Sequence, residues 1–417
     1  MWPEYVVAGP FMFFGGQMGR TRDGAFITRY ADAPNVGERA ATSFEWVAGM
    51  EAPVGAQGIA IYERYRELLA REGSGHGHFL RYHIYQRDKH FFSVFDRIRR
   101  TYEPKPPAST AVGLGRFEPQ DRATLCIDSI VLRGNAERSF GARTVLPGVS
   151  QHVAAATFSH VVNAGPFLFL AGQIPIDASK PGSPLIRNYD DIPEAGRFLR
   201  VGRSHEDARN GPIASQTWFT YDLIRQHLEA SGSSLDQILN LTVYLQDMRD
   251  FGTFHRVHER FFQSGAPALT VIEAAEVGHK GTLIEIEPTA IITGRGVERR
   301  VIDPRGWRAP AQMSACVEAG GLAFFSGISG GGDGAQAQAS AAMSELQSRL
   351  ATAGRQVTDI AALTVYLRDM DEFQIVKHVL ERGFGTHRPA LTVLEVPAVS
   401  PVRDARVSLT AIGWFGE

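Results

Sequence analysis

One segment occurs in three copies along the chain, and this repeat constrains the possible architecture more than any other feature. The copies read LTVYLQDMRDF at residues 241–251, LTVYLRDMDEF at 363–373 and, in a diverged form, RYHIYQRDKHF at 81–91. Apolar and polar residues alternate over the first six positions, which predicts a strand. Beyond Asp250 the apolar residues recur every three or four positions, which predicts a helix. A repeat of this size indicates several similar units.

The elements around each copy also recur in one order. An apolar strand that ends in a glycine turn and a helix precede the segment, and a strand with Pro-Ala-x-Thr and a closing strand follow it. This order predicts an α+β fold in which each unit is a mixed sheet with two helices on one face. Three units would average 139 residues, 417/3, an ordinary domain size. The boundaries that we predict are residues 1–140, 141–298 and 299–417.

The first and second units each carry a long polar insert that the third unit lacks. The inserts, Asp23 to Gly55 and Asp177 to Gly211, share the pattern Ile-x-x-Tyr-x-Asp-x-Pro at residues 27–34 and 186–193. Long loops in compact domains are usually functional or disordered, and a shared pattern favours an ordered segment. We therefore expect the inserts to be flaps that cover the mouths of clefts and set specificity.

Charge and cysteine content exclude several classes of function. The 43 basic and 45 acidic residues give a net charge of −2, so no electrostatic case exists for binding nucleic acid or an anionic membrane. The two cysteines, Cys126 and Cys316, suit a reducing compartment, and the start of the chain shows no targeting segment. We expect a cytoplasmic protein without a metal or a cofactor, because no ligand spacing is present and Gly330-Gly331-Gly332 lacks the ending of a phosphate-binding loop.

The motifs of the second unit, taken in order, resemble the RidA/YjgF family of reactive-intermediate deaminases. They are Gly-Gln-Ile-Pro at 172–175, the repeated segment, Pro-Ala-Leu-Thr at 267–270 and Ile-Glu-Ile-Glu at 284–287. The resemblance implies a chorismate-mutase-like fold in which three units pack their sheets around a threefold axis, with sites between neighbours. A sheet that helices cover on one face still needs a partner for its other face. We therefore expect an intrachain pseudo-trimer of three RidA-type units.

The same resemblance suggests catalytic residues. Glu285 matches the family's catalytic glutamate, and Glu287 should share its strand face, although a solvated edge strand would show the same pattern. The equivalents that we expect are Cys126 and Asp128 in the first unit and Arg406 and Ser408 in the third. His255, with Phe95 and Lys377 in the corresponding places, lies on a helix position near the family's substrate, but a surface histidine is an equal alternative. We expect His258 to be exposed. The substrate-binding candidates are Gly172, Gln173, Ile174, Thr270, Glu273, Arg187 and Arg203.

The main departure from the family concerns an arginine that grips the substrate's carboxylate from the Pro-Ala-Arg position. Here Ser109, Leu269 and Leu391 occupy this position. One interpretation is that an arginine of the second insert substitutes, and the candidates are Arg187, Arg200 and Arg203. The other is that the substrate is neutral or cationic, which the acidic Glu273 and Glu395 on the same strands favour.

The function that the sequence favours is cofactor-free hydrolysis of a small imine, enamine or related C–N compound, with a carboxylate activating water. A non-catalytic ligand-binding or regulatory protein is one alternative, and a chorismatase-like enzyme acting on a cyclic carboxylate is another. Ribonuclease activity, also ascribed to the family, is the least favoured because the charge balance is neutral. The expected partner is a small-molecule substrate, with further homo-oligomerisation left open.

Overall fold

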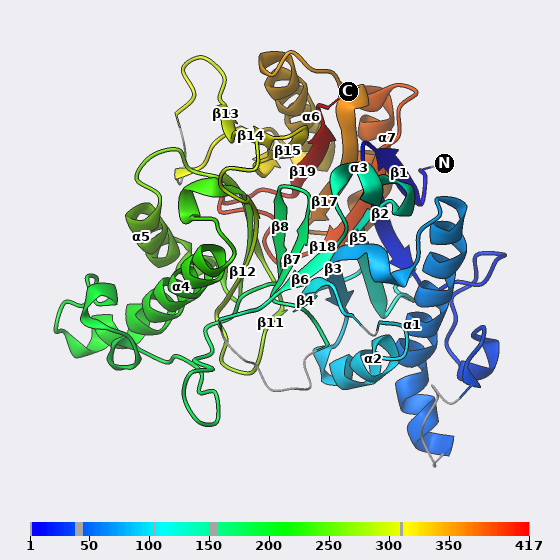
Figure 1. Ribbon diagram of the computed structural model, residues 1–417, viewed down its shortest axis with the longest axis horizontal. Helices are drawn as coiled ribbons and strands as arrows, with labels where there is room; N and C mark the ends of the chain where they lie inside the picture. Colours follow the sequence, from blue (N-terminus) through cyan, green and yellow to red (C-terminus); the bar gives the residue numbers. More distant parts are fainter. Residues whose placement is uncertain (1, 38–44, 104, 150–156, 309–311, 417) are drawn as a thin grey trace.

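Three mixed β-sheets form the centre of the molecule, and their helices lie at three separate places on its periphery (Figure 1). The computed structural model describes residues 2–37, 45–103, 105–149, 157–308 and 312–416. No helix in these ranges is long and apolar enough to cross a membrane. The three sheets with their helices confirm the α+β fold of three tandem units that the repeat predicts.

The first unit builds a sheet in the order β1-β2-β5-β3-β4. Strands β3 and β4 run parallel and the other neighbours antiparallel. The elements are β1 (Tyr5–Ala8), β2 (Phe11–Met18), α1 (Glu45–Arg71), β3 (Phe79–Gln86), α2 (Phe92–Arg99), β4 (Ala108–Gly113), β5 (Leu125–Leu132) and the short α3 (Glu137–Phe140).

The second and third units repeat this plan, with the parallel pairs β9/β10 and β17/β18. The second unit contains β6 (Thr144–Leu146), β7 (Val161–Ala164), β8 (Phe167–Leu170), α4 (Ser204–Ala230), β9 (Ile238–Leu245), α5 (Phe251–Phe261), β10 (Ala268–Glu273), β11 (Glu276–Val277) and β12 (Ile284–Ile291). The third contains β13 (Arg300–Ile302), β14 (Cys316–Ala319), β15 (Leu322–Phe325), β16 (Ile328–Ser329), α6 (Gly334–Thr352), β17 (Ile360–Leu367), α7 (Phe373–Phe384), β18 (Ala390–Glu395) and β19 (Val407–Trp414).

Each sheet buries both faces. One face packs on the unit's own helices, and in the second unit Phe254 and Val257 of α5 join Leu241 and Val243 of β9 in one core. The opposite faces of the three sheets pack against one another, and the equivalent residues Phe11, Phe167 and Leu322 meet in a shared core. Burying each such side chain contributes about 1.5–3 kcal/mol relative to exposure. The sheets therefore supply each other's missing partner, as an intrachain pseudo-trimer requires.

The loop after each parallel strand pair reaches into a neighbouring unit. β11 of the second unit pairs with β4 of the first through Glu276↔Gly113 and Val277↔Val112. The loop of the first unit bonds to β18 of the third, where Gly115 N–H donates to Glu395 O over 3.0 Å. The loop of the third unit bonds to β10 of the second, where Glu273 N–H donates to Ala398 O over 2.9 Å. These exchanges form a closed ring and cover strand edges that would otherwise be free to pair.

The strand register identifies equivalent residues in the three units. The pairs at one level are Tyr85 with Cys126, Tyr244 with Glu285, and Tyr366 with Ser408. The pairs at the next level are His83 with Asp128, Thr242 with Glu287, and Thr364 with Thr410. The first unit thus follows the expected alignment. The third does not, because Ser408 and Thr410, rather than Arg406 and Ser408, match the two glutamates.

The first copy of the repeated segment also begins one residue later than the sequence alignment placed it. Tyr85 is equivalent to Tyr244, so the copy is residues 82–92, and Phe92 begins α2 as Phe251 begins α5. The helix position of His255 is therefore occupied by Asp96 and not by Phe95. The physical reason is the shorter α2, of 8 residues against 11 in α5. The first unit has one residue fewer than the second between the start of this helix and β4, so that Ala108 and Ala268 are again equivalent, as in the sequence alignment.

Candidate functional site

A cleft of about 890 Å³ lies between the first and second units, and Glu285 lines it. Glu285 is on β12, which lies between β9 and β8, so the solvated edge strand considered above is excluded. Its side chain is 4 % exposed, and Oε2 has no hydrogen-bond partner among the described residues. A buried carboxylate oxygen without a partner is available to a water or a substrate.

The glycine turn of the second unit faces this carboxylate. A Cβ at Gly172 would lie only 2.1 Å from Glu285 Oε1, so glycine is required for the approach. Gln173 and Ile174 also line the cleft, and the Gln173 amide donates back to Ala171 O over 2.9 Å. The turn therefore places backbone beside the carboxylate of Glu285.

The first unit supplies the opposite wall. Gly172 N–H donates to Ser109 O on β4 over 3.3 Å, which joins the glycine turn to the strand that carries Pro-Ala-Ser-Thr. Lys89, Asp96 and Arg99 come from α2 and the turn before it, and all three line the cleft. The neighbour that completes the Glu285 cleft is thus the first unit, a point that the sequence left open.

Arg99 occupies the space beside Ser109, where the family carries its strand arginine. The guanidinium is 2 % exposed and donates to Ser109 Oγ over 3.2 Å and to Thr157 Oγ1. Asp96 pairs with it over 2.8 Å. Among the described residues, Arg99 is the one arginine that lines this cleft.

Burial controls the protonation of Glu285. Loss of solvation raises the pKa of Glu285, the ammonium of Lys89 opposes this, and the neighbouring Glu287 adds to it, so that the pKa rises to about 7. Backbone hydrogen bonds from Ala111 and Gly278 lower the pKa further toward its usual value without cancelling the rise. A carboxylate with this pKa exchanges protons near neutral pH, which suits a general base or acid.

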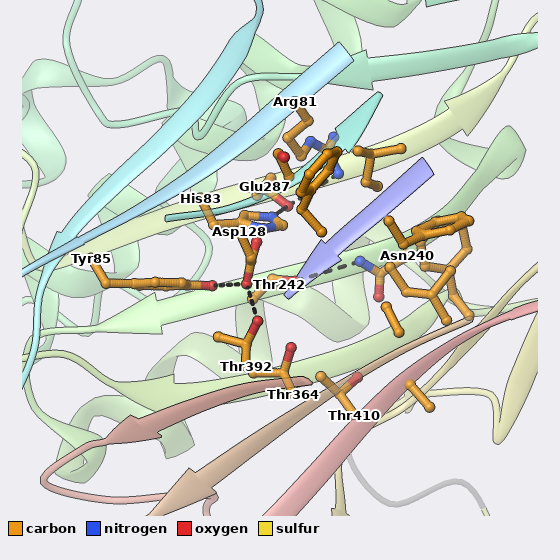
Figure 2. A pocket seen from close by; sticks show the side chains of 18 of the residues that line it. Arg81, His83, Tyr85, Asp128, Asn240, Thr242, Glu287, Thr364, Thr392 and Thr410 are labelled. Atoms are coloured by element: carbon orange, nitrogen blue, oxygen red, sulfur yellow. Dashed lines mark hydrogen bonds and ion pairs between the residues drawn. The ribbon is translucent and has the colours of Figure 1, made fainter. Parts of the chain in front are cut away.

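Glu287 lies one pleat further along the same face, in a separate cavity of about 60 Å³ on the pseudo-threefold axis (Figure 2). Its carboxylate pairs with Arg81 over 3.1 Å, with His83 Nε2 over 2.8 Å and with Thr110 Oγ1. Burial raises the pKa of Glu287, but Arg81 and His83 outweigh it, so the pKa is lowered overall. Glu287 is therefore a fixed anion of the axis with all its oxygens occupied, rather than a second base in the cleft.

His83 bridges two carboxylates in this axial cavity. Nδ1 contacts Asp128 while Nε2 contacts Glu287, and Asp128 also accepts a hydrogen bond from Thr392 of the third unit over 2.9 Å. Burial lowers the pKa of His83, but Glu287 and Asp128 together raise it to about 10. The ring is therefore protonated at neutral pH. All three units contribute to this buried network (Figure 2).

Several predicted site residues lie elsewhere. Thr270 contacts the third unit, with its hydroxyl 3.2 Å from Thr410 Oγ1, and Glu273 accepts the N–H of Met248 over 2.9 Å. His255 lies 3.7 Å from Glu259 on α5 and does not line the Glu285 cleft. His258, expected to be exposed, is fully buried and bonded to Tyr221 and to Gln312 O. Its burial follows from the packing of α5 on α4.

The three candidate arginines of the second insert are exposed and do not line the cleft. Arg200 pairs with Asp190 over 3.2 Å and Arg203 with Glu206 over 3.1 Å, while Arg187 lies at the surface. No residue from 175 to 211 lines the Glu285 cleft. The insert instead buries Ile186, Tyr189 and Ile192 in the core of the second unit. The pattern of the second insert thus marks its anchors, and the expected flap over this cleft is not seen. Residues of the first insert, among them Gly24, Asp32 and Pro34, line a different cleft of about 1180 Å³ between the first and third units.

Three residues of the site, Lys89, Asp96 and Arg99, were not predicted. All come from the diverged first unit, where the one-residue shift hid the helix positions that face the neighbour. The signal that would have revealed them is the alignment of Tyr85 with Tyr244. Among the described residues, no group of three or more His, Cys, Asp or Glu side chains is arranged to hold a metal ion.

Comparison with known proteins agrees with the fold of three similar units. The family model described as Endoribonuclease L-PSP matches residues 149–292 and 307–413. A RutC family protein of Pyrococcus horikoshii is 35 % identical over 133 residues, which cover 32 % of this chain and 85 % of that protein. The 2-iminobutanoate/2-iminopropanoate deaminase of Mus musculus is 22 % identical over 149 residues, which cover 36 % of this chain and 91 % of the enzyme.

Two solved structures are similar to this chain over different lengths. A putative endoribonuclease from Klebsiella pneumoniae, 28 % identical, covers 32 % of this chain and 98 % of its own, with a TM-score of 0.31. A chorismatase, 13 % identical, covers 81 % of this chain and 93 % of its own with a TM-score of 0.50, and so shares the multi-unit fold. The chain therefore belongs to the Endoribonuclease L-PSP family, which is the RidA/YjgF family that its motifs resemble.

Proposed function

We propose that the chain hydrolyses a small imine or enamine in the cleft between its first and second units and releases ammonia. The observation that carries the proposal is Glu285: a buried carboxylate with one oxygen unpartnered and a pKa of about 7, held against a glycine turn. Such a group can take a proton from a water that adds to a C=N carbon and later return it.

The other residues of the cleft fit the same chemistry. The backbone at Gly172 lies beside the reacting centre without a side chain in the way, while its N–H stays bonded to Ser109 O. Arg99, beside Ser109, puts a cation where the family's strand arginine is missing, so the proposed substrate carries a carboxylate. This replaces the expectation of an arginine from the insert, and it makes a purely cationic substrate less suitable.

Binding without catalysis is the second candidate, and it suits the other two interfaces. Cys126 and Ser408 occupy the register position of Glu285 in the first and third units. Burial raises the pKa of the Cys126 thiol well above its usual value, so it is a poor base. A single catalytic cleft in a three-unit chain follows from this asymmetry.

The test is ammonia release from a panel of substrates by the wild-type chain and by Glu285→Gln. The panel contains imino acids generated in place from amino acids and matched neutral enamines. Because a chorismatase shares the fold, chorismate, which contains no nitrogen, is tested in parallel by following its disappearance. Gln keeps the size of the side chain but cannot act as a base, so we expect kcat to fall by about 10²–10⁴-fold while substrate still binds. The control is Cys126→Ala, which should leave kcat unchanged. Full activity of Glu285→Gln refutes the proposal, and turnover of chorismate alone favours the cyclic-carboxylate alternative.

A further inference from the structure

Lys89 is a charged residue at a place where the other two units have methionine. It begins the 3₁₀ turn of residues 89–91, which is equivalent to the turns that begin at Met248 and Met370. Met370 is fully buried in the core of the third unit, and Met248 packs on the core of the second. Lys89 instead extends into the wall of the Glu285 cleft.

Two backbone carbonyls, one from each unit, fix the position of the amino group. Lys89 Nζ donates to Ala111 O on β4 over 2.8 Å and to Gly278 O, just after β11, over 3.1 Å. An ammonium group has three N–H donors, so these bonds leave one for a ligand. The same amino group interacts electrostatically with Glu285, whose Oε2 has no hydrogen-bond partner among the described residues.

The charged groups around Lys89 come from several elements. Glu276 on β11 and Glu285 on β12 attract it, whereas burial outweighs both and lowers the pKa of Lys89. His279, in the loop after β11, also feels the ammonium, and its own pKa is lowered by burial and by Lys89. Lys280 in the same loop, His160 of the second unit, and His90, Asp96 and Arg99 of the first unit complete the charged and titratable lining. An ammonium that loses its proton more readily than usual is a better acid.

We propose that Lys89 is a second catalytic residue of this cleft, the acid that protonates the substrate nitrogen while Glu285 acts as the base. The inference rests on the proposed function and adds a proton donor to it. The second and third units have methionine in place of this donor. Lys89 is therefore a second residue, besides Glu285, that distinguishes this cleft from the other two interfaces.

The proposed reaction has two stages, addition of water and loss of ammonia. Glu285 takes a proton from water, the water oxygen bonds to the C=N carbon, and the π-electron pair moves to nitrogen, which takes a proton from Lys89. The product is a neutral carbinolamine, beside a protonated Glu285 and a neutral Lys89. Glu285 then protonates the amine, the C–N bond breaks to give ammonia and a carbonyl, and the hydroxyl proton returns to Lys89. Both residues end in their starting states.

Two substitutions separate proton donation from a simple positive charge. Lys89→Met installs the residue of the other two units, and we expect kcat to fall about 10²–10⁴-fold with KM little changed. Without the ammonium, the acid limb of kcat/KM should move to higher pH, because Lys89 lowers the pKa of Glu285. Lys89→Arg keeps the charge but does not release its proton at usable pH, so its kcat should stay low. The matched control is Lys377→Met on α7, outside this cleft, which should leave kcat and the pH profile unchanged.

A third variant guards against a merely structural effect. Lys89→Ala should regain activity when ethylammonium is added, since a small amine can occupy the vacated position, whereas a misfolded cleft would not respond. Wild-type kcat in Lys89→Met, restoration by Lys89→Arg, or loss of activity without rescue in Lys89→Ala overturns the assignment. If Glu285→Gln is inactive in the same assay while Lys89→Met is active, only the role of Lys89 fails. If Glu285→Gln is active, the proposed function itself fails.

Discussion

Adding one methyl group to Gly172 tests the geometry of the cleft directly. The Cβ of Gly172→Ala would lie 2.1 Å from Oε1 and 2.9 Å from Cδ of Glu285. Real Cβ atoms do not approach other atoms within 3.0 Å, so the carboxylate has to retreat by 3.0 − 2.1 = 0.9 Å. Misplacing a catalytic group by about 1 Å costs about 10²-fold in rate. We expect a loss of this size in kcat/KM for ammonia release.

The fold should survive this substitution. Gly172 does not have a positive φ, so alanine brings no backbone strain, and crowding costs about 1–3 kcal/mol of unfolding free energy. Gly327→Ala is the matched control. It changes the equivalent turn of the third unit, where the nearest atom is 3.5 Å away and no carboxylate faces it. Circular dichroism melting and steady-state kinetics measured on both variants give the comparison. Wild-type kcat/KM in Gly172→Ala, or an equal loss in Gly327→Ala, would refute the reasoning.

Two further predictions concern charge. Because the pKa of Glu285 is raised from 4.5 to about 7, the folded state holds this proton more tightly than the unfolded state does. This difference stabilises the folded protein fully below about pH 4.5, and the stabilisation is lost as the pH rises through 7. The unfolding free energy of Glu285→Gln should therefore rise relative to that of wild type by up to about 3 kcal/mol between pH 5 and pH 8. If the difference in unfolding free energy, measured by urea denaturation, does not change with pH, the carboxylate is not buried as described. Arg99→Gln should raise the KM for a carboxylate substrate about 10–100-fold and leave the KM for a neutral enamine unchanged. The control, Arg187→Gln, should change neither KM. An equal change in both KM values in Arg99→Gln would exclude the contact with the carboxylate.

The fold could be predicted because its signals are local and occur three times. The alternation at residues 241–246 and the helical spacing after Asp250 recur in each unit, and the sheet face left by two helices requires a partner. Glu285 and the Gly172 turn could be predicted for a related reason, since both belong to the best-preserved unit.

The rest of the site depends on contacts between units, which no local pattern specifies. Lys89 and Arg99 face the cleft only because β4 of the first unit receives β11 of the second. The shorter α2 shifted the apparent alignment by one residue, and on a helix one residue is a rotation of about 100°. The pattern of the second insert did not predict its role, because tyrosine and isoleucine suit a flap or an anchor equally well in sequence, and only their burial in the core of the second unit distinguishes the two.

The axial cavity shows what becomes possible when three similar units belong to one polypeptide. In a homotrimer built from the first unit, threefold symmetry would place three copies each of Arg81, His83 and Asp128 on the axis, and six cations would face three anions. This chain instead sets one arginine and one protonated histidine against Asp128 and Glu287, and the remaining positions hold Asn240, Ala362 and threonines. Buried charges are tolerated only when they are matched. Because the three units belong to one chain, each can place a different residue on the axis, and the three units are not interchangeable there.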